Sequence, residues 1–403
     1  MSQTLSSRRL AAAIVALALG GFGIGTVEFA MMGLLPDVAA GVDVTIPEAG
    51  HLISAYALGV VVGAPILTAL AAKLPRKRVV LALMLFFGLA NLSSFLAPDY
   101  FSLLITRFFS GLPHGAYFGV AAVLAASIVP PTKRGRAIAM VMLGLSVANV
   151  IGVPLATFLG QQFGWRTLFI LVGAINFATV LAIWAFVPAQ PAPEGATIRG
   201  ELSALRRLQV WLTLLIGIVG FGGFFAVYTY ISPTMTQVTG LAESWLPLVV
   251  GLYGVGMVLG NILGGKLADR SVLGSIYWVM ALIVVVLLLF ALGVGQIWTA
   301  LPLVLAVGAS GSMLVPALQT RLLDVAPAGS LASSMNHSAL NIANALGAFL
   351  GGLVIAWGWG FVAPALVGAC LALLGLGIAL FSGRQERRST SPARSASSSI
   401  DHS

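Results

Sequence analysis

Apolar stretches of about twenty residues recur along the whole chain and are separated by short polar interruptions. A helix needs about 20 apolar residues to cross a bilayer, so each stretch is a candidate transmembrane helix. Twelve stretches meet this criterion, at about 10–35, 50–72, 78–96, 102–128, 136–159, 166–187, 209–231, 246–267, 275–294, 299–320, 332–356 and 361–381. The pattern predicts an all-α polytopic membrane protein with twelve transmembrane helices.

The longest polar interruption falls in the middle of the chain, at residues 188–207. It separates two sets of six spans, so we expect two six-helix bundles at residues 10–187 and 208–382, joined by a cytoplasmic linker. A short cytoplasmic tail, residues 1–9, precedes the first bundle. The Ser- and Arg-rich segment 383–403 is expected to be a disordered cytoplasmic tail.

Composition excludes an ordinary soluble enzyme. Of the 403 residues, 59% are hydrophobic and only 8% are charged, whereas soluble domains carry about 25% charged residues. The single cysteine, Cys370, permits no internal disulfide, and no metal site is expected. No phosphate-binding loop of the G-x-x-x-x-G-K-[ST] type and no H-E-x-x-H motif is present. We therefore expect no enzymatic activity and no bound cofactor.

Basic residues predict how the chain crosses the membrane. All but Arg107 and Arg166 of the 21 Lys and Arg residues fall in loops or tails on one side of the predicted helices. By the positive-inside rule this side is cytoplasmic, and an even number of spans places both termini there. The net charge of +9 therefore reports topology and not a nucleic-acid partner. The expected location is the inner (plasma) membrane.

Glu28 lies inside the first apolar stretch, within a glycine-rich run. At about 1.5 Å per residue it lies about 12 Å below Pro36, where the span should reach the surface. An ionised carboxylate at this depth costs at least ~2.5–3.5 kcal/mol, so it should face a cavity or a partner. It either makes a structural polar contact or handles a proton or cation, and we favour the second interpretation.

The fourth span carries Arg107 at a depth similar to that of Glu28, and Gly111, His114 and Phe118 share its helical face. Arg107 would either offset the charge of Glu28 or pin the helix to backbone carbonyls or headgroups. His114 would either exchange a proton with Glu28 or be a satisfied core residue. We take Glu28, Arg107 and His114 as the candidate proton-coupling group.

Polar and aromatic side chains in the second half suggest a ligand cavity. His337, Asn341 and Asn344 share one face of the eleventh span, with Asn336 to one side. They contact a substrate or hold helices together. Phe224 and Tyr228 belong to an aromatic stretch that would suit a drug-like ligand or simple packing. In the tenth span Ser312 and Met313, near Pro316, indicate a broken helix.

The loops after the second and eighth spans indicate an internal repeat. Gly265-Lys-Leu-Ala-Asp269-Arg270 matches the G-x-x-x-D-R loop of the major facilitator superfamily. The first-half copy has Ala72 in place of the aspartate and Pro75 in place of a glycine, but keeps Arg76-Lys77-Arg78. The resemblance implies a conformational latch of Gly265, Asp269, Arg270, Arg76 and Arg78, and an ordinary solvated turn is the alternative.

Other motifs extend the resemblance over nearly the whole chain. Arg107-Phe-Phe-Ser-Gly111 resembles the R-x-x-x-G signature of the fourth span. Gly144, Gly152, Pro154 and Gly160 resemble the pattern of proton-coupled exporters, with the Gly-Pro pair split by Val153. Further matching stretches are 23–29, 33–39, 53–57, 164–166 and 341–347. Together they are similar to the twelve-span drug:proton antiporters, in the branch of arabinose-efflux-permease-like and chloramphenicol-resistance exporters.

The resemblance implies a proton-coupled antiporter that exports small organic molecules such as drugs by alternating access. The first, fourth, seventh and tenth spans would line its cavity, the proton gradient would drive it, and it would act as a monomer. Its partners would be a small-molecule substrate, protons and the lipid bilayer. A sugar or nucleoside exporter, or an uncoupled facilitator, is the alternative within transport. A non-transporting membrane sensor or scaffold is the alternative from another class.

Overall fold

The computed structural model describes residues 7–71, 73–130, 134–189, 206–325 and 330–390. Within these ranges the chain is helical and contains no strand. Twelve helices, or runs of consecutive helices, are long and apolar enough to cross a membrane. The all-α fold and the number of spans expected from hydropathy are therefore confirmed.

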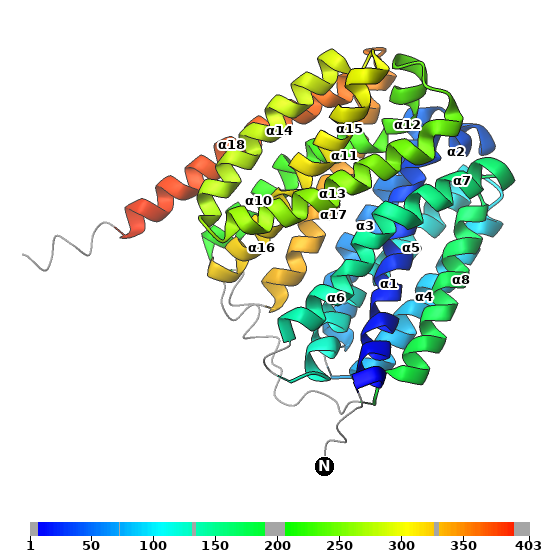
Figure 1. Ribbon diagram of the computed structural model, residues 1–403, viewed down its shortest axis with the longest axis vertical. Coiled ribbons are helices and arrows are strands. Elements are labelled where there is room, and N and C mark those ends of the chain that lie inside the picture. The colour runs from blue at the N-terminus through cyan, green and yellow to red at the C-terminus, as the bar shows by residue number, and fades with distance from the viewer. Residues whose placement is uncertain (1–6, 72, 131–133, 190–205, 326–329, 391–403) are drawn as a thin grey trace, which may run out of the picture.

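The first half of the chain, coloured blue to green in Figure 1, contains six spans and one short connecting helix, α2. Its elements are α1 (Ser7–Gly33), α2 (Leu35–Gly41), α3 (Ile46–Ala71), α4 (Arg76–Leu96), α5 (Tyr100–Ser127), α6 (Arg134–Val147), η2 (Ala148–Gly152), α7 (Val153–Phe163) and α8 (Thr167–Phe186). The side chain of Asp99 caps α5 by accepting a hydrogen bond from the backbone N–H of Ser102, 2.8 Å away. This bond holds the pKa of Asp99 below its usual value.

The second half, coloured green to red in Figure 1, contains the other six spans. Its elements are α10 (Leu208–Gly220), α11 (Gly222–Thr229), α12 (Ile231–Pro233), η3 (Thr234–Val238), η4 (Glu243–Trp245), α13 (Leu246–Ala268), α14 (Val272–Gly293), α15 (Ile297–Ser312), α16 (Leu314–Val325), α17 (Ser330–Ala356) and α18 (Ala363–Thr390). Of the linker expected at 188–207, residues 190–205 lie outside the described residues.

Three spans are interrupted helices. The π-helix η2 separates α6 from α7, Phe221 separates α10 from α11, and Met313 separates α15 from α16. The break at Met313 confirms the broken tenth span expected from its sequence. Interrupted helices within a membrane protein are tolerated where neighbouring helices and polar side chains satisfy the freed backbone groups.

The last helix is longer than the sequence predicts. The segment 383–403 was expected to be disordered, but α18 continues as a helix through Thr390. Both carboxylate oxygens of Glu386 accept hydrogen bonds from Arg321 of α16, at 3.0 and 2.9 Å. This bidentate pair gives the polar end of α18 a partner, which composition alone does not reveal. Residues 391–403 lie outside the described residues.

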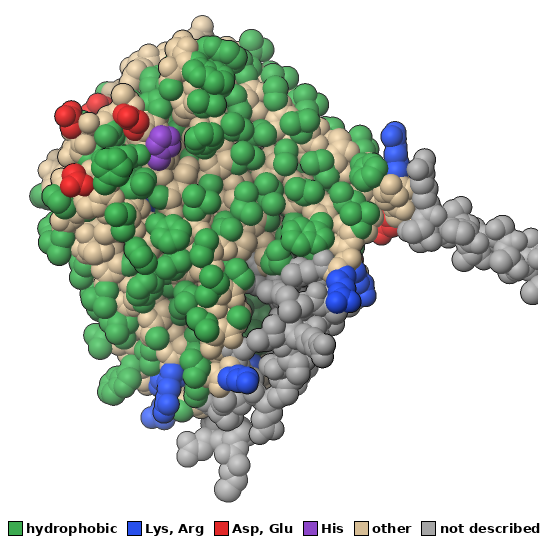
Figure 2. All heavy atoms as spheres, turned by 180° about the vertical axis from the view of Figure 1, so that it is seen from behind, with side chains coloured by type: hydrophobic (Ala, Val, Ile, Leu, Met, Phe, Trp, Pro, Cys, Tyr) green, Lys and Arg blue, Asp and Glu red, His purple; other side chains and the backbone are tan. Residues whose placement is uncertain are grey.

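On the face shown in Figure 2, most of the acidic side chains gather at one end of the molecule and the basic side chains lie toward the other. We call the end of the helices with Asp37, Asp99 and Glu243 the acidic end, and the end with Arg78 and Lys266 the basic end. Between the two ends the exterior is mainly apolar, as Figure 2 shows. Such a surface suits the hydrocarbon of a bilayer.

Hydrogen bonds join the two halves toward the acidic end. The hydroxyl of Ser232 donates to the backbone oxygens of Met32 and Gly33, both at 2.8 Å. Gln161 donates to the backbone oxygen of Glu243 at 2.9 Å. Deeper in the interface, Ser54 of α3 donates to a backbone oxygen of α17 at 3.2 Å. In this conformation the halves therefore meet at the acidic end.

Candidate functional site

Glu28 lies on α1 and is buried, with 5% of its surface exposed. Its neighbour Phe29 reaches the second half, where its ring lies 6.4 Å from that of Phe225 and 5.6 Å from that of Tyr228. Glu28 therefore sits in the wall of the first half that faces the second. The structure confirms the burial that makes an ionised carboxylate costly here.

The exporter-type glycines explain how α1 is held. A Cβ added at Gly144, Gly152 or Gly160 would collide with Ala18, Thr26 or Leu34 respectively, all on α1 or directly after it. These three glycines let the consecutive helices α6, η2 and α7 lie directly against the helix that carries Glu28. Pro154 points elsewhere: a Cβ at Gly251 of α13 would lie 3.2 Å from its ring. The glycines of this motif thus pack against α1 and the residue after it, and its proline packs against α13 of the second half.

Arg107 is fully buried on α5 and has no carboxylate within ion-pair distance among the described residues. Glu28 and Arg107 therefore form no direct ion pair here, and the prediction that Arg107 offsets the charge of Glu28 stays a prediction. The guanidinium carbon lies 4.3 Å from the centroid of the Tyr56 ring, a cation–π contact. The helices α3 and α5 bring Arg107 onto Tyr56 rather than onto α1.

Tyr56 connects Arg107 to His114. Its hydroxyl lies 3.0 Å from Nδ1 of His114, and both side chains are buried. The close approach of α3 to α5 depends on glycine: a Cβ at Gly59 would collide with the backbone oxygen of Phe108. Sequence reasoning gave no role to Tyr56, and its position in a buried polar cluster is the main addition from the structure.

The polar cluster continues into the second half. The ring of His114 lies 5.4 Å from that of Phe118, and Phe118 stacks on His337 at 5.8 Å with an interplanar angle of 4°. His337 belongs to α17, so this contact crosses between the halves. The stripe Arg107, His114 and Phe118 expected on one face of α5 is thus observed, and it meets the polar stripe of α17.

The polar stripe of α17 contains buried groups without hydrogen-bond partners among the described residues. The amide nitrogen of Asn341 donates to the backbone oxygen of His337 at 3.0 Å, but its Oδ1 has no partner. Both amide atoms of Asn344 lack one. Asn336, which lies outside the stripe, donates to Gln319 at 2.9 Å. Unpaired buried amides are costly, so the stripe is suited to meeting a polar ligand.

The aromatic stretch of α11 forms a packed cluster. Tyr228 stacks on Tyr253 of α13 at 3.9 Å, and Phe224 lies 5.1 Å from the same ring. Phe224 also packs against Gly311 of α15. The hydroxyl of Tyr228 is buried without a partner among the described residues. Phe224 is therefore mainly a packing residue here, whereas Tyr228 offers a free hydroxyl next to Phe29.

The remaining predicted cavity residues lie at the break of the tenth span. Ser312 ends α15 and Met313 follows it, and both are buried. The backbone of Met313 lies against Gly264 of α13, where an added Cβ would collide with it. Met313 thus packs on α13, and neither residue is part of the contacts that link Arg107 to His337.

Among the described residues no ion pair links the predicted latch residues, although the backbone N–H of Asp269 donates to the backbone oxygen of Gly265 at 3.0 Å. Asp269 and Arg270 follow α13, and no ion pair involves either of them within the described ranges. Arg76 and Arg78 begin α4 in the other half. An ion pair between Arg321 and Glu386 lies wholly in the second half and was not anticipated.

Comparisons with known proteins give a consistent result. Residues 17–336 match the family model of the Major Facilitator Superfamily. The Inner membrane transport protein YdhP of Escherichia coli (strain K12) is 42% identical over 95% of this chain and 98% of its own length. A Chloramphenicol resistance protein of Streptomyces lividans is 32% identical, covering 90% of this chain and 93% of its own. A Helicobacter pylori (strain G27) protein named "Probable sugar efflux transporter" is 29% identical over the same shares.

A solved structure shows the same fold. It is a bacterial homologue of the human lysosomal transporter Spinster, in an inward-facing and unoccupied conformation. The TM-score is 0.74 at 16% sequence identity, and the match covers 94% of this chain and 98% of the other. The chain therefore shares the fold of that protein.

Proposed function

Because the chain belongs to the Major Facilitator Superfamily, we propose that it is a proton-coupled exporter of small organic molecules that works by alternating access. The twelve spans and the name of the E. coli relative support a place in the inner membrane. We assign the basic end to the cytoplasm by the positive-inside rule, which puts both termini there. The chain would act as a monomer, with the proton gradient as its driving force and no cofactor.

The observation that carries the proposal is that the first half buries two opposite charges, Glu28 on α1 and Arg107 on α5, without an ion pair between them. Ionised Glu28 would offset part of the charge of Arg107, since both side chains are buried in the first half. Protonation of Glu28 removes that balance and leaves the arginine charge uncompensated in a low-dielectric region. The two protonation states therefore favour different arrangements of the halves, which is what coupling requires.

The contacts at the acidic end assign this conformation to one step of the cycle. With the halves joined there, the site would open toward the basic, cytoplasmic end once the Phe118–His337 contact between the halves separates. Glu28 would release its proton to the cytoplasm and substrate would bind. After reorientation, substrate would leave and Glu28 would take a proton from outside. One proton would enter for each such exchange, although the net charge moved depends on the substrate.

The surroundings of the site favour a substrate with both apolar and polar parts. Phe29 and Tyr228 supply aromatic surface, while Asn341 and Asn344 supply unpaired amide atoms. The similarity to a chloramphenicol resistance protein supports a drug-like molecule. The amide stripe and the relative named as a sugar efflux transporter favour a sugar as the second candidate.

Proton release from the purified protein tests the proposal. Candidate substrates, namely chloramphenicol, arabinose and a purine nucleoside, are added to protein in weakly buffered detergent while pH is recorded. Release by one class, absent in Glu28→Gln, is expected. Asp43→Asn is the matched control, because Asp43 is an exposed carboxylate in a left-handed backbone conformation (φ 54°) that asparagine tolerates. Substrate binding without proton release would contradict proton-coupled antiport and favour uncoupled transport.

A further inference from the structure

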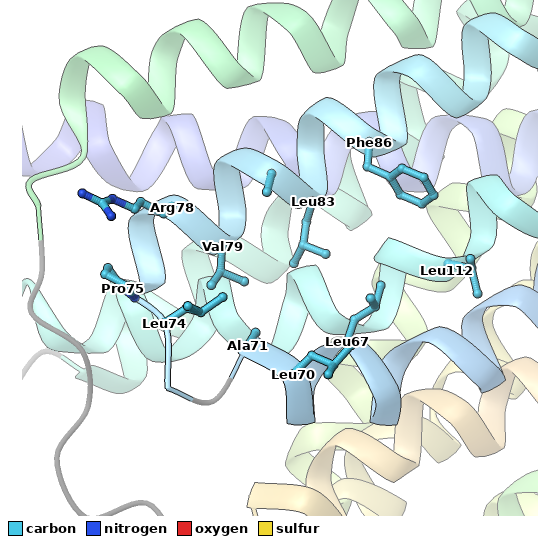
Figure 3. A pocket seen from close by; sticks show the side chains of 11 residues that line it. Leu67, Leu70, Ala71, Leu74, Pro75, Arg78, Val79, Leu83, Phe86 and Leu112 are labelled. Atoms are coloured by element: carbon cyan, nitrogen blue, oxygen red, sulfur yellow. The ribbon is translucent and has the colours of Figure 1, made fainter.

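An apolar groove lies on the outer surface of the first half near the basic end (Figure 3). Its volume is about 500 Å³. Leu67 and Leu70 of α3 form one wall, Val79 and Phe86 of α4 form the other, and Leu112 of α5 lies at its inner end. The groove follows α4 from residue 79 to residue 86, about 10 Å at 1.5 Å per residue.

The groove is open to the membrane and not to the substrate site. Leu70 is 70% exposed, and Phe86 also lies on the surface. The buried residues Tyr56 and His114 are on the inner faces of α3 and α5. A narrow apolar channel on the lipid-facing surface is the shape that a hydrocarbon chain fills.

The basic end of the groove carries an available cation. Arg78 lines the groove and is exposed, and no hydrogen bond or ion pair of its guanidinium is found among the described residues. Its neighbour Lys77 is occupied, because its amine donates to the backbone oxygen of Trp184 at 2.9 Å on the other side of α4. Figure 3 shows Arg78 and Pro75 at the end of the groove next to the loop before α4.

The loop at this end has no carboxylate to neutralise its charge. The stretch from Lys73 to Arg78 contains four basic residues and no Asp or Glu. The corresponding loop of the second half places Asp269 directly before Arg270. The mouth of the groove is therefore cationic, whereas its second-half counterpart carries a compensating charge.

We propose that the groove binds one anionic glycerophospholipid, with an acyl chain between α3 and α4 and its phosphate on Arg78. Basic pockets between transmembrane helices are suited to anionic headgroups, and each nearby Lys or Arg adds about fivefold to the affinity. The headgroup of a zwitterionic lipid also carries a cation, which would lie next to the basic residues at the mouth of the groove. The groove thus selects its lipid by charge at the mouth and by shape along the walls.

Lipid retention in native mass spectrometry tests this site on the full-length protein. Protein purified in a delipidating detergent is titrated with phosphatidylglycerol or phosphatidylcholine of identical chains. We expect one tightly retained phosphatidylglycerol and weaker retention of phosphatidylcholine. Arg78→Gln should reduce phosphatidylglycerol retention about fivefold. Phosphatidylcholine retention should fall by less, because its choline cation already offsets part of the phosphate charge. Arg270→Gln, at the corresponding loop of the second half, is the control for charge.

A second variant tests the apolar part of the groove. Ala82 lies in the groove on the exposed face of α4, so Ala82→Trp should fill it and lower the retention of both lipids. Ala281→Trp, on the exposed face of α14, is its control. Equal retention of the two lipids by the wild-type protein, or an Arg78→Gln variant that keeps the preference, would overturn the proposal. Displacement of bound lipid by a transported drug would instead make the groove a substrate site.

Discussion

Arg107 and Arg321 are both buried, but their positive charges are accommodated in different ways. Arg321 makes a bidentate ion pair with Glu386 and a further hydrogen bond to Gln209, which ties α10, α16 and α18 together. Arg107 rests on the ring of Tyr56, and its Nε and Nη1 have no partner among the described residues. The first arrangement is that of a structural residue, whereas the second leaves a charge available to the chemistry of the site.

The largest expected effect comes from Arg107→Gln. Without the guanidinium, the charge of Glu28 has no counter-charge in the site, so coupled transport should be abolished. The melting temperature in detergent should change little, because Glu28 can take up a proton once its counter-charge is gone. Substrate uptake by proteoliposomes and thermal unfolding of the same preparation measure both quantities. A large loss of stability would instead make Arg107 a structural residue.

Arg321→Gln should have the opposite profile. It removes the ion pair with Glu386, and that carboxylate is 37% exposed, so the loss of stability should be only about 1–2 kcal/mol. Transport per folded molecule should be retained. Thermal unfolding with and without high salt measures the contribution of the pair. Loss of transport at unchanged stability would show that the ion pair acts in the cycle.

Tyr56→Phe sharpens the comparison within the first half. The variant keeps the ring beneath Arg107 and removes only the hydrogen bond to His114, so transport should slow about fivefold and its pH dependence should change. Tyr117→Phe is the matched control, because it removes a buried hydroxyl that donates to the backbone oxygen of Leu17 at 2.6 Å. Equal transport rates and pH profiles for both variants would deny Tyr56 a role in proton movement.

The smallest expected effect is at the acidic end. Burial and the charge of Glu243 raise the pKa of Asp37 above its usual value. When the halves are in contact, Asp37 is more easily protonated. The contact should therefore become more stable as pH falls through this raised pKa. Asp37→Asn should keep the acidic end closed with less dependence on pH. Distances between spin labels at Ala40 and Ser244 report closure, and an unchanged pH dependence in the variant would contradict this account.

Hydropathy was sufficient to predict the fold, because the membrane requires long apolar helices whose number can be read from the chain. The break at Met313 was also predictable, since glycine, serine and proline cluster there. The partner of Arg107 was not, because it depends on how closely α3 approaches α5 at Gly59. The stacking of Phe118 on His337 joins residues of different halves, which no periodicity within one helix can indicate.

Gradient-driven transport by Glu28→Gln tests the central claim most directly. Proteoliposomes containing this variant or Asp43→Asn are loaded with substrate, and exchange is measured with and without an imposed pH gradient. The account predicts that Glu28→Gln still exchanges substrate at equilibrium but gains nothing from the gradient, while Asp43→Asn behaves as the wild-type protein does. Substrate accumulation driven by the gradient in Glu28→Gln would contradict the assignment of the coupling proton to Glu28.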